Sequence, residues 1–201
     1  MKSITRHIAI LIAAIAAGTG LATGQMLKLN APLTLGGSPN LGYEHQLNHR
    51  WALSADVFWL PYMSDKHEEV FRSLQITGEA RYYFKETLDS RMAHGWYLGG
   101  YLMYGDFNIG LYRHNDMDKS FRRAGWGVSG GVSGGWKHKF NDRWQMDINL
   151  GVGYAHMRYH KYKLGGAYRH RPIGGWRSSK WIGPTRFSIS FGYVLDCGCR
   201  K

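Results

Sequence analysis

The sequence predicts an all-β fold, an eight-stranded antiparallel up-and-down transmembrane β-barrel. Three observations support this prediction. Apolar and polar residues alternate in eight consecutive segments, which is typical of strands with two different faces. The 201 residues include 27 Gly, 13 Tyr, 8 Trp and 8 Phe, a composition that favours strands and turns. The connections between segments alternate between short and mostly longer ones, as they do in membrane barrels.

The first 24 residues have the layout of a secretory signal peptide. Lys2, Arg6 and His7 precede an apolar run over 8–17, and small residues continue to Gly24. The run is too short to cross a bilayer as a helix. We therefore predict that 1–24 directs export, that 25–195 forms the barrel, and that 196–201 is a periplasmic tail.

The charge of the chain favours anionic partners. The formal net charge is +12, and without Lys2 and Arg6 of the leader it is about +10. Export argues against nucleic acid, which leaves lipid phosphates and acidic polymers. The two cysteines, Cys197 and Cys199, lie at the end of the chain, where they cannot staple a core.

The first four segments each carry apolar residues on one face. They cover 25–35, 40–47, 51–59 and 73–84. Pro32 lies inside the first, where a proline usually demotes a strand or marks a bulge. The third is the most regular, because every second residue from Trp51 to Trp59 is apolar.

The last four segments cover 95–105, 125–140, 144–157 and 181–195. The segment 95–105 is apolar on both faces, and the other three alternate. Several segments have the 9–12 residues that a tilted strand needs to cross a bilayer. Eight such strands can close into a small barrel that has no free edge.

The same short turn motif, Asn-x-Arg-Trp, occurs twice, as Asn-His-Arg-Trp over 48–51 and as Asn-Asp-Arg-Trp over 141–144; we call each a corner. We expect Asn to bend the chain, Arg to lie in the polar edge and Trp to anchor at a membrane interface. Both corners and the link 85–94 would lie on the same side as the termini. The connections 36–39, 60–72, 106–123 and 158–180 would lie on the other side.

Alternation alone does not decide which face lies inside, since a soluble lipocalin-like barrel would enclose its apolar face. Three features favour an apolar exterior: the polar face is rich in small residues, aromatic residues gather near segment ends, and the charges on the polar face are balanced. The predicted interior charge network consists of Lys28, Glu44, Asp56, Glu79, Arg81, Lys137, Asp147 and Arg186.

The chain resembles a family of uncharacterised small outer-membrane β-barrel proteins, known as a domain of unknown function. The resemblance covers nearly all of 25–195, and its phrases occur at 27–47, 50–59, 79–84, 140–162 and 181–195. It implies an eight-stranded barrel similar to the transmembrane part of outer-membrane protein A, and it implies no known activity. The chain departs from the family pattern in two places. The family often has paired cysteines in its last external loop, and 158–180 has none. Outer-membrane barrels tend to end on an aromatic residue, whereas here Asp-Cys-Gly-Cys-Arg-Lys follows the last strand.

The segment 158–180 contains seven basic residues and no acidic one, and we predict that it contacts lipopolysaccharide phosphates at the outer leaflet. A solvated loop that merely suits an anionic surface is the alternative. The interleaved Tyr and Trp residues leave a glycan or an envelope protein open as a partner. The seven residues are Arg158, Lys161, Lys163, Arg169, Arg171, Arg177 and Lys180.

We predict no catalytic residues, no metal and no cofactor. His156 and His160 are four apart, which on a strand separates them by about 13 Å. An eight-stranded interior is also too narrow for a conducting channel. The expected role is that of a structural or surface-binding protein of the Gram-negative outer membrane, with lipopolysaccharide and the barrel-insertion machinery as partners.

Two other functions stay open. One is a lipid-modifying enzyme of deacylase or acyltransferase type, and the other is an exported lipocalin-like ligand-binding barrel. The residues that an enzyme would use near the rim are His114, Asp116, Asp118, His160 and His170.

Overall fold

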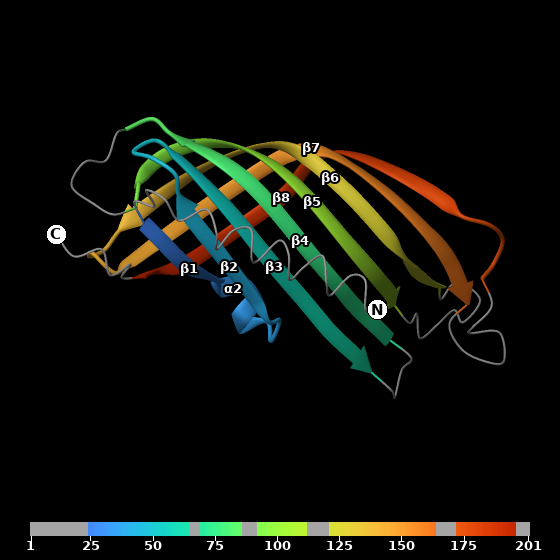
Figure 1. The fold of residues 1–201 in the computed structure, drawn as a ribbon. Helices are drawn as coiled ribbons and strands as arrows, with labels where there is room; N and C mark the ends of the chain where they lie inside the picture. The colour runs from blue at the N-terminus through green and yellow to red at the C-terminus, as the bar shows by residue number, and fades with distance from the viewer. Residues whose placement is uncertain (1–23, 65–68, 86–91, 112–120, 164–171, 196–201) are drawn as a thin grey trace, which may run out of the picture.

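The computed structural model describes residues 24–64, 69–85, 92–111, 121–163 and 172–195. In it the chain forms a closed barrel of eight antiparallel strands (Figure 1). Each strand pairs with its sequence neighbours, and the first pairs with the last. This confirms the predicted eight-stranded antiparallel barrel. The strands are β1 (Gly24–Asn30), β2 (Asn40–Gln46), β3 (Trp51–Ser64), β4 (Glu69–Tyr83), β5 (Gly95–Leu111), β6 (Phe121–Lys139), β7 (Trp144–Lys163) and β8 (Arg177–Leu195).

The first predicted strand is shorter than expected. It ends at Asn30, and the chain continues as the short helix α2 (Ala31–Leu35). The Asn30 side chain caps this helix by accepting a hydrogen bond from the Leu33 N–H at 3.4 Å. Pro32 lies in the first turn, where its missing N–H needs no partner. The prediction of a strand over 25–35 is therefore wrong beyond Asn30.

The other strands extend further than predicted. β3 and β4 continue into the expected loop 60–72, and β5 and β6 continue into 106–123. β7 runs to Lys163, and β8 begins at Arg177. The connections between these strands are thus shorter than the sequence suggested. The leader over 1–23 and the tail over 196–201, including Cys197 and Cys199, lie outside the described residues.

The first Asn-x-Arg-Trp corner joins β2 to β3 through its asparagine. The Asn48 Oδ1 atom accepts hydrogen bonds from the backbone N–H groups of Arg50 and Trp51, both at 2.9 Å. Arg50 then donates to the Tyr82 hydroxyl at 3.1 Å. The Trp51 and Tyr82 rings meet edge to face, with their centroids 5.1 Å apart. The corner is therefore fixed by one side-chain acceptor and by an aromatic pair that joins β3 to β4.

The second corner, between β6 and β7, repeats this geometry. Asn141 Oδ1 accepts from the Arg143 N–H at 2.9 Å and from the Trp144 N–H at 2.8 Å. Arg143 donates to the Tyr193 hydroxyl at 3.3 Å, and the Trp144 and Tyr193 rings lie 5.2 Å apart. We call the end of the barrel that carries both corners the inner end, and the opposite end the outer end.

Replacing the corner asparagine tests this account. Asn48→Ala removes the acceptor for two backbone N–H groups, and we expect it to lower the free energy of unfolding by about 1–2 kcal/mol. Asn48→Asp keeps an acceptor oxygen at the same position and should lose less. Urea unfolding of the refolded barrel measures both variants. Equal losses in the two would contradict the role assigned to the Oδ1 atom.

The outward-pointing side chains of the barrel are mostly apolar. Leu98, Leu102 and Leu150 are more than half exposed, at 53%, 75% and 54%. Exposed aromatic residues bound this apolar belt toward both ends of the strands. Among them are Trp51, Trp96 and Trp144 toward the inner end, and Trp59, Tyr104 and Tyr154 toward the outer end.

The inner end of the barrel is closed by the segment that leads into β5. Met92 and Ala93 are almost completely buried there. The Ala93 N–H donates to the Gln46 side-chain oxygen at 3.0 Å. Ala93 packs with Tyr83 and Tyr97 in one small apolar cluster. No helix in the described parts of the chain is long and apolar enough to cross a membrane.

Candidate functional site

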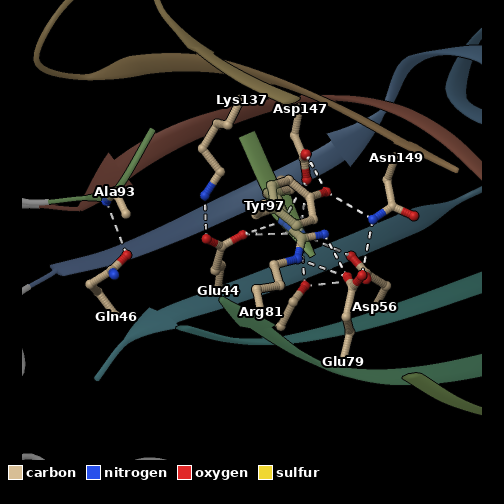
Figure 2. Close-up of polar contacts among 12 residues, drawn as sticks. Glu44, Gln46, Asp56, Glu79, Arg81, Ala93, Tyr97, Lys137, Asp147 and Asn149 are labelled. Atoms are coloured by element: carbon tan, nitrogen blue, oxygen red, sulfur yellow. Dashed lines mark hydrogen bonds and ion pairs between the residues drawn. The ribbon is translucent and has the colours of Figure 1, made fainter. Parts of the chain in front are cut away.

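Arg81 of β4 lies at the centre of a charged cluster inside the barrel and is fully buried. Its guanidinium forms ion pairs with Glu44 of β2 at 2.8 Å, Glu79 of β4 at 2.7 Å and Asp147 of β7 at 2.7 Å. The Arg81 Cζ atom also lies 4.5 Å from the centroid of the Tyr97 ring, a cation–π contact. Figure 2 shows these side chains pointing toward one another. One buried cation is thus shared by three carboxylates from three strands.

Two lysines also pair with these carboxylates, and one of them reaches Asp56 of β3 as well. The Lys137 Nζ atom of β6 donates to Glu44 Oε1. The Lys28 Nζ atom of β1 lies 3.5 Å from Glu44 Oε2, 3.6 Å from Asp56 Oδ1 and 3.7 Å from Asp147 Oδ2. Because Lys28 and Lys137 are both buried, these contacts replace the water that each ammonium group would otherwise hold.

Arg186 of β8 extends the cluster toward the outer end. It pairs with Asp56 at 2.7 Å and with Glu79 at 3.2 Å. The structure therefore brings together all eight residues that the sequence placed in an interior network. These are Lys28, Glu44, Asp56, Glu79, Arg81, Lys137, Asp147 and Arg186.

Neutral side chains that sequence reasoning missed also belong to the network. The Tyr97 hydroxyl donates to Asp147 at 2.7 Å, and the Tyr83 hydroxyl donates to Glu44 at 3.0 Å. The Asn149 amide donates to the Tyr97 hydroxyl at 2.8 Å. With Tyr97 of β5 included, every one of the eight strands contributes a residue to this cluster.

A signal for two of these neutral residues was present in the sequence. Tyr83 is two residues after Arg81, and Asn149 is two residues after Asp147, so alternation places each on the lumen side. Tyr97 gave no such signal, because the segment 95–105 has no charged residue to mark its inner face.

Glycines make room for the large side chains of the lumen. A Cβ atom at Gly135 would clash with the ring of Tyr97. At Gly131 and Gly153 it would come within 2.9 Å and 2.8 Å of the Tyr101 hydroxyl oxygen. These glycines on β6 and β7 therefore let tyrosines of β5 fill the barrel.

The cluster links the eight strands of the barrel across the lumen. Its four acids and four bases sum to zero formal charge, and each charged group has an opposite charge within 4 Å. Together with Met92 and Ala93 it fills the inner half of the lumen. In the described ranges, no three His, Cys, Asp or Glu side chains are grouped as a metal ion would require.

The basic residues predicted for an outer loop lie largely on strands. Arg158, Lys161 and Lys163 belong to β7, and Arg177 and Lys180 belong to β8. The prediction of a loop over 158–180 is corrected accordingly. Two further members of the predicted set, Arg169 and Arg171, lie outside the described residues.

Strand alternation divides these basic residues between two surfaces. On β7 the exposed apolar residues Leu150, Val152 and Tyr154 fix the outward positions, so Arg158 also points outward and Lys161 points to the lumen. The Arg158 Cζ atom lies 5.5 Å from the centroid of the Trp176 ring.

Arg122 and Lys180 stand on the same outward surface as Arg158. Lys180 of β8 pairs in register with His156, an outward position of β7. Arg122 of β6 pairs with Tyr162, and its Cζ atom lies 4.6 Å from the centroid of that ring. We call Arg122, Arg158 and Lys180 the basic rim. The sequence prediction did not include Arg122, because it considered only the basic residues of 158–180.

Of the five residues considered for an enzyme at the rim, the described parts of the chain contain His160 alone. His160 packs against Trp176, with their ring centroids 4.0 Å apart. His114, Asp116, Asp118 and His170 lie outside the described residues.

Comparisons with known proteins give a family and a structural relative. A family model described as a protein of unknown function (DUF3575) matches residues 7–195. No curated protein matches the chain. Among solved structures, the NMR solution structure of the E. coli outer membrane protein W is similar at 18% sequence identity, covering 78% of this chain and 79% of that chain with a TM-score of 0.35.

Proposed function

This chain belongs to the DUF3575 family of proteins of unknown function, and we propose that it is a bacterial outer-membrane barrel whose basic rim binds the phosphates of anionic lipid. The observation that carries the proposal is the distribution of polarity across the barrel wall. Ion pairs lie in the inner half of the lumen, and exposed Leu, Val and aromatic residues cover the outside. The leader over 1–24 would direct export, and the barrel-insertion machinery would place the protein in the membrane.

The height of the apolar belt supports a membrane position. Trp59 is eight positions after Trp51 on β3, and Tyr154 is ten positions after Trp144 on β7. At about 3.3 Å per residue and a tilt of about 40°, these intervals span roughly 20–25 Å along the barrel axis. The apolar band of outer-membrane barrels is about 25 Å tall and lies between aromatic girdles.

The basic rim lies where lipid phosphates would be. Arg158 is four residues beyond Tyr154 on β7, about 13 Å along the strand and roughly 10 Å along the axis. Contact with the rings of Tyr162 and Trp176 holds the guanidinium groups of Arg122 and Arg158 against the outer surface. Guanidinium groups bind phosphate through paired hydrogen bonds, and Lys180 adds a third positive charge.

Lipid A binding tests the proposed role. We expect the barrel in phosphatidylcholine vesicles to bind bisphosphorylated lipid A, and the triple variant Arg122→Gln/Arg158→Gln/Lys180→Gln to bind it at least about tenfold more weakly, because three charge-assisted contacts are lost. Native mass spectrometry or fluorescence titration measures the affinity, and dephosphorylated lipid A serves as the comparison ligand.

The matched control removes the same charge at the opposite end of the barrel. Arg50→Gln/Lys139→Gln/Arg143→Gln changes three basic residues near the inner end and should leave lipid A affinity unchanged. If the two triple variants lose affinity equally, the interaction follows net charge and the rim has no special part in it.

A further inference from the structure

The barrel wall has a notch where two of its strands are short. β1 and β2 contain seven residues each, whereas the other strands contain 14 to 20 (Figure 1). β8 pairs with β1 only from Ser190 to Leu195, and β3 pairs with β2 only from Ala52 to Phe58. Toward the outer end, the described parts of β3 and β8 therefore have no strand between them.

A cavity of about 190 Å³ lies behind this notch. Its inner wall is polar and includes Asp56, Gln75, Thr77, Arg186 and Ser188. Its mouth is apolar, because outward-pointing side chains of α2, β2, β3 and β8 line it. These are Leu33, Leu41, Val57 and Phe187.

The cavity contains hydrogen-bonding groups that the fold does not use. Thr77 and Ser188 are 6% and 8% exposed, and their hydroxyls make no hydrogen bond to another described residue. Asp56 pairs with Arg186 and keeps 28% of its side chain exposed. Because both hydroxyls lie on the cavity wall, they can form hydrogen bonds with the polar head of a molecule that enters the cavity.

The free edge of β3 is poorly suited to pairing with another strand. The Trp59 N–H donates to the Pro39 carbonyl, so it points toward β2. Two residues further along, the nitrogen of Pro61 points to the same edge and carries no hydrogen. A proline at an exposed edge removes a donor that an added strand would need. A small molecule suits this notch better than a peptide does.

We infer that the notch admits a single-chain lipid with an uncharged, hydroxyl-bearing head, of monoacylglycerol type, from the outer leaflet into the cavity; this rests on the membrane position proposed above. The lipid head would accept hydrogen bonds from the hydroxyls of Thr77 and Ser188 and donate one to the Asp56 carboxylate. The acyl chain would leave over Leu41 and Phe187 into the bilayer. An anionic head is disfavoured, because Asp56 faces the cavity and the nearby cations, Lys28 and Arg186, already have carboxylate partners.

Photolabelling in vesicles tests this inference. The probe is a monopalmitoylglycerol with a diazirine near the head, added to the full-length barrel in phosphatidylcholine vesicles. We expect saturable labelling of the peptides that contain Leu41, Val57 and Phe187. Excess monopalmitoylglycerol should displace the probe, and palmitate should not. Thr77→Val/Ser188→Ala should weaken saturable labelling by about tenfold, because two hydrogen bonds are lost. Val has the size of Thr, and Ala differs from Ser only by the missing hydroxyl.

Ser129→Ala is the matched control, because it removes a lumen hydroxyl that lies in a different hollow of the barrel. Its labelling should equal that of the wild type. Uniform, non-saturable labelling of the notch and of peptides containing Leu102 and Val132 would overturn the inference and leave the membrane position intact. If palmitate displaced the probe as well as monopalmitoylglycerol does, the inference that the lipid head is uncharged would be wrong. Absence of labelling from the whole outer surface would instead contradict the proposed membrane barrel.

Discussion

Arg81→Met is expected to lower the free energy of unfolding by about 3–5 kcal/mol, because it leaves Glu44, Glu79 and Asp147 without the cation that they share. Methionine has nearly the length of the arginine stem, so the loss reports the charge and its hydrogen bonds more than it reports packing. Urea unfolding of the barrel in phosphatidylcholine vesicles measures the change.

Two further variants separate charge balance from a general loss of stability. Arg81→Met/Glu79→Gln restores equal numbers of acids and bases in the lumen and should recover part of the stability that Arg81→Met loses. Arg143→Met removes an arginine from an exposed corner and should change the free energy of unfolding by no more than about 0.5 kcal/mol. A double variant less stable than Arg81→Met would contradict the network account.

Leu102→Arg is expected to cost about 2–4 kcal/mol in vesicles, since it places a charge near the middle of the apolar belt. In a water-soluble barrel the same change would be nearly neutral, because Leu102 is 75% exposed and its side chain packs little against the protein. The prediction therefore distinguishes a barrel whose apolar outside faces lipid from one whose apolar outside faces water. Unfolding titrations in vesicles measure it.

Gln75→Arg on the neighbouring strand is a useful comparison for Leu102→Arg. Gln75 lies on the lumen side of β4, where its side chain lines the hollows of the outer half. A cation there would have access to polar partners, and the cost should be smaller than for Leu102→Arg. A larger cost at Gln75 than at Leu102 would count against the assignment of the two faces.

The interior network could be predicted because charges mark the lumen side of a strand. Glu44, Asp56, Glu79 and Asp147 each lie on a strand with clean alternation, so their parity identified the inner face before the structure did. Which acid forms an ion pair with which base could not be predicted in the same way. The distances within the cluster depend on the stagger of all eight strands.

The strand ends could not be predicted from alternation. Beyond the apolar belt both faces of a strand are polar, so the pattern fades in β7 after Met157 although the hydrogen-bonded ladder continues to Lys163. The helix α2 was missed because Leu29, Ala31, Leu33 and Leu35 also fit a period of two.

A bulge in β8 shows how parity can change within one strand. Gly151 pairs with Arg186, but Val152 pairs with Pro184, which leaves Thr185 as the extra residue. Without the bulge, Trp181 would lie on the same face as Phe187, because the two residues are six apart. After the bulge it lies in a lumen hollow together with Thr185 and Met157.

Site-directed spin labelling tests the central claim, an apolar outside and a charged inside, most directly. Cys197 and Cys199 would first be replaced by Ser, and a nitroxide then attached through a single cysteine at Leu98, Leu102, Val132 or Leu150 in vesicle-embedded protein. We predict high collision rates with oxygen, which concentrates in lipid, and low rates with a water-soluble nickel chelate at all four positions. High accessibility to the chelate at these positions would contradict the claim.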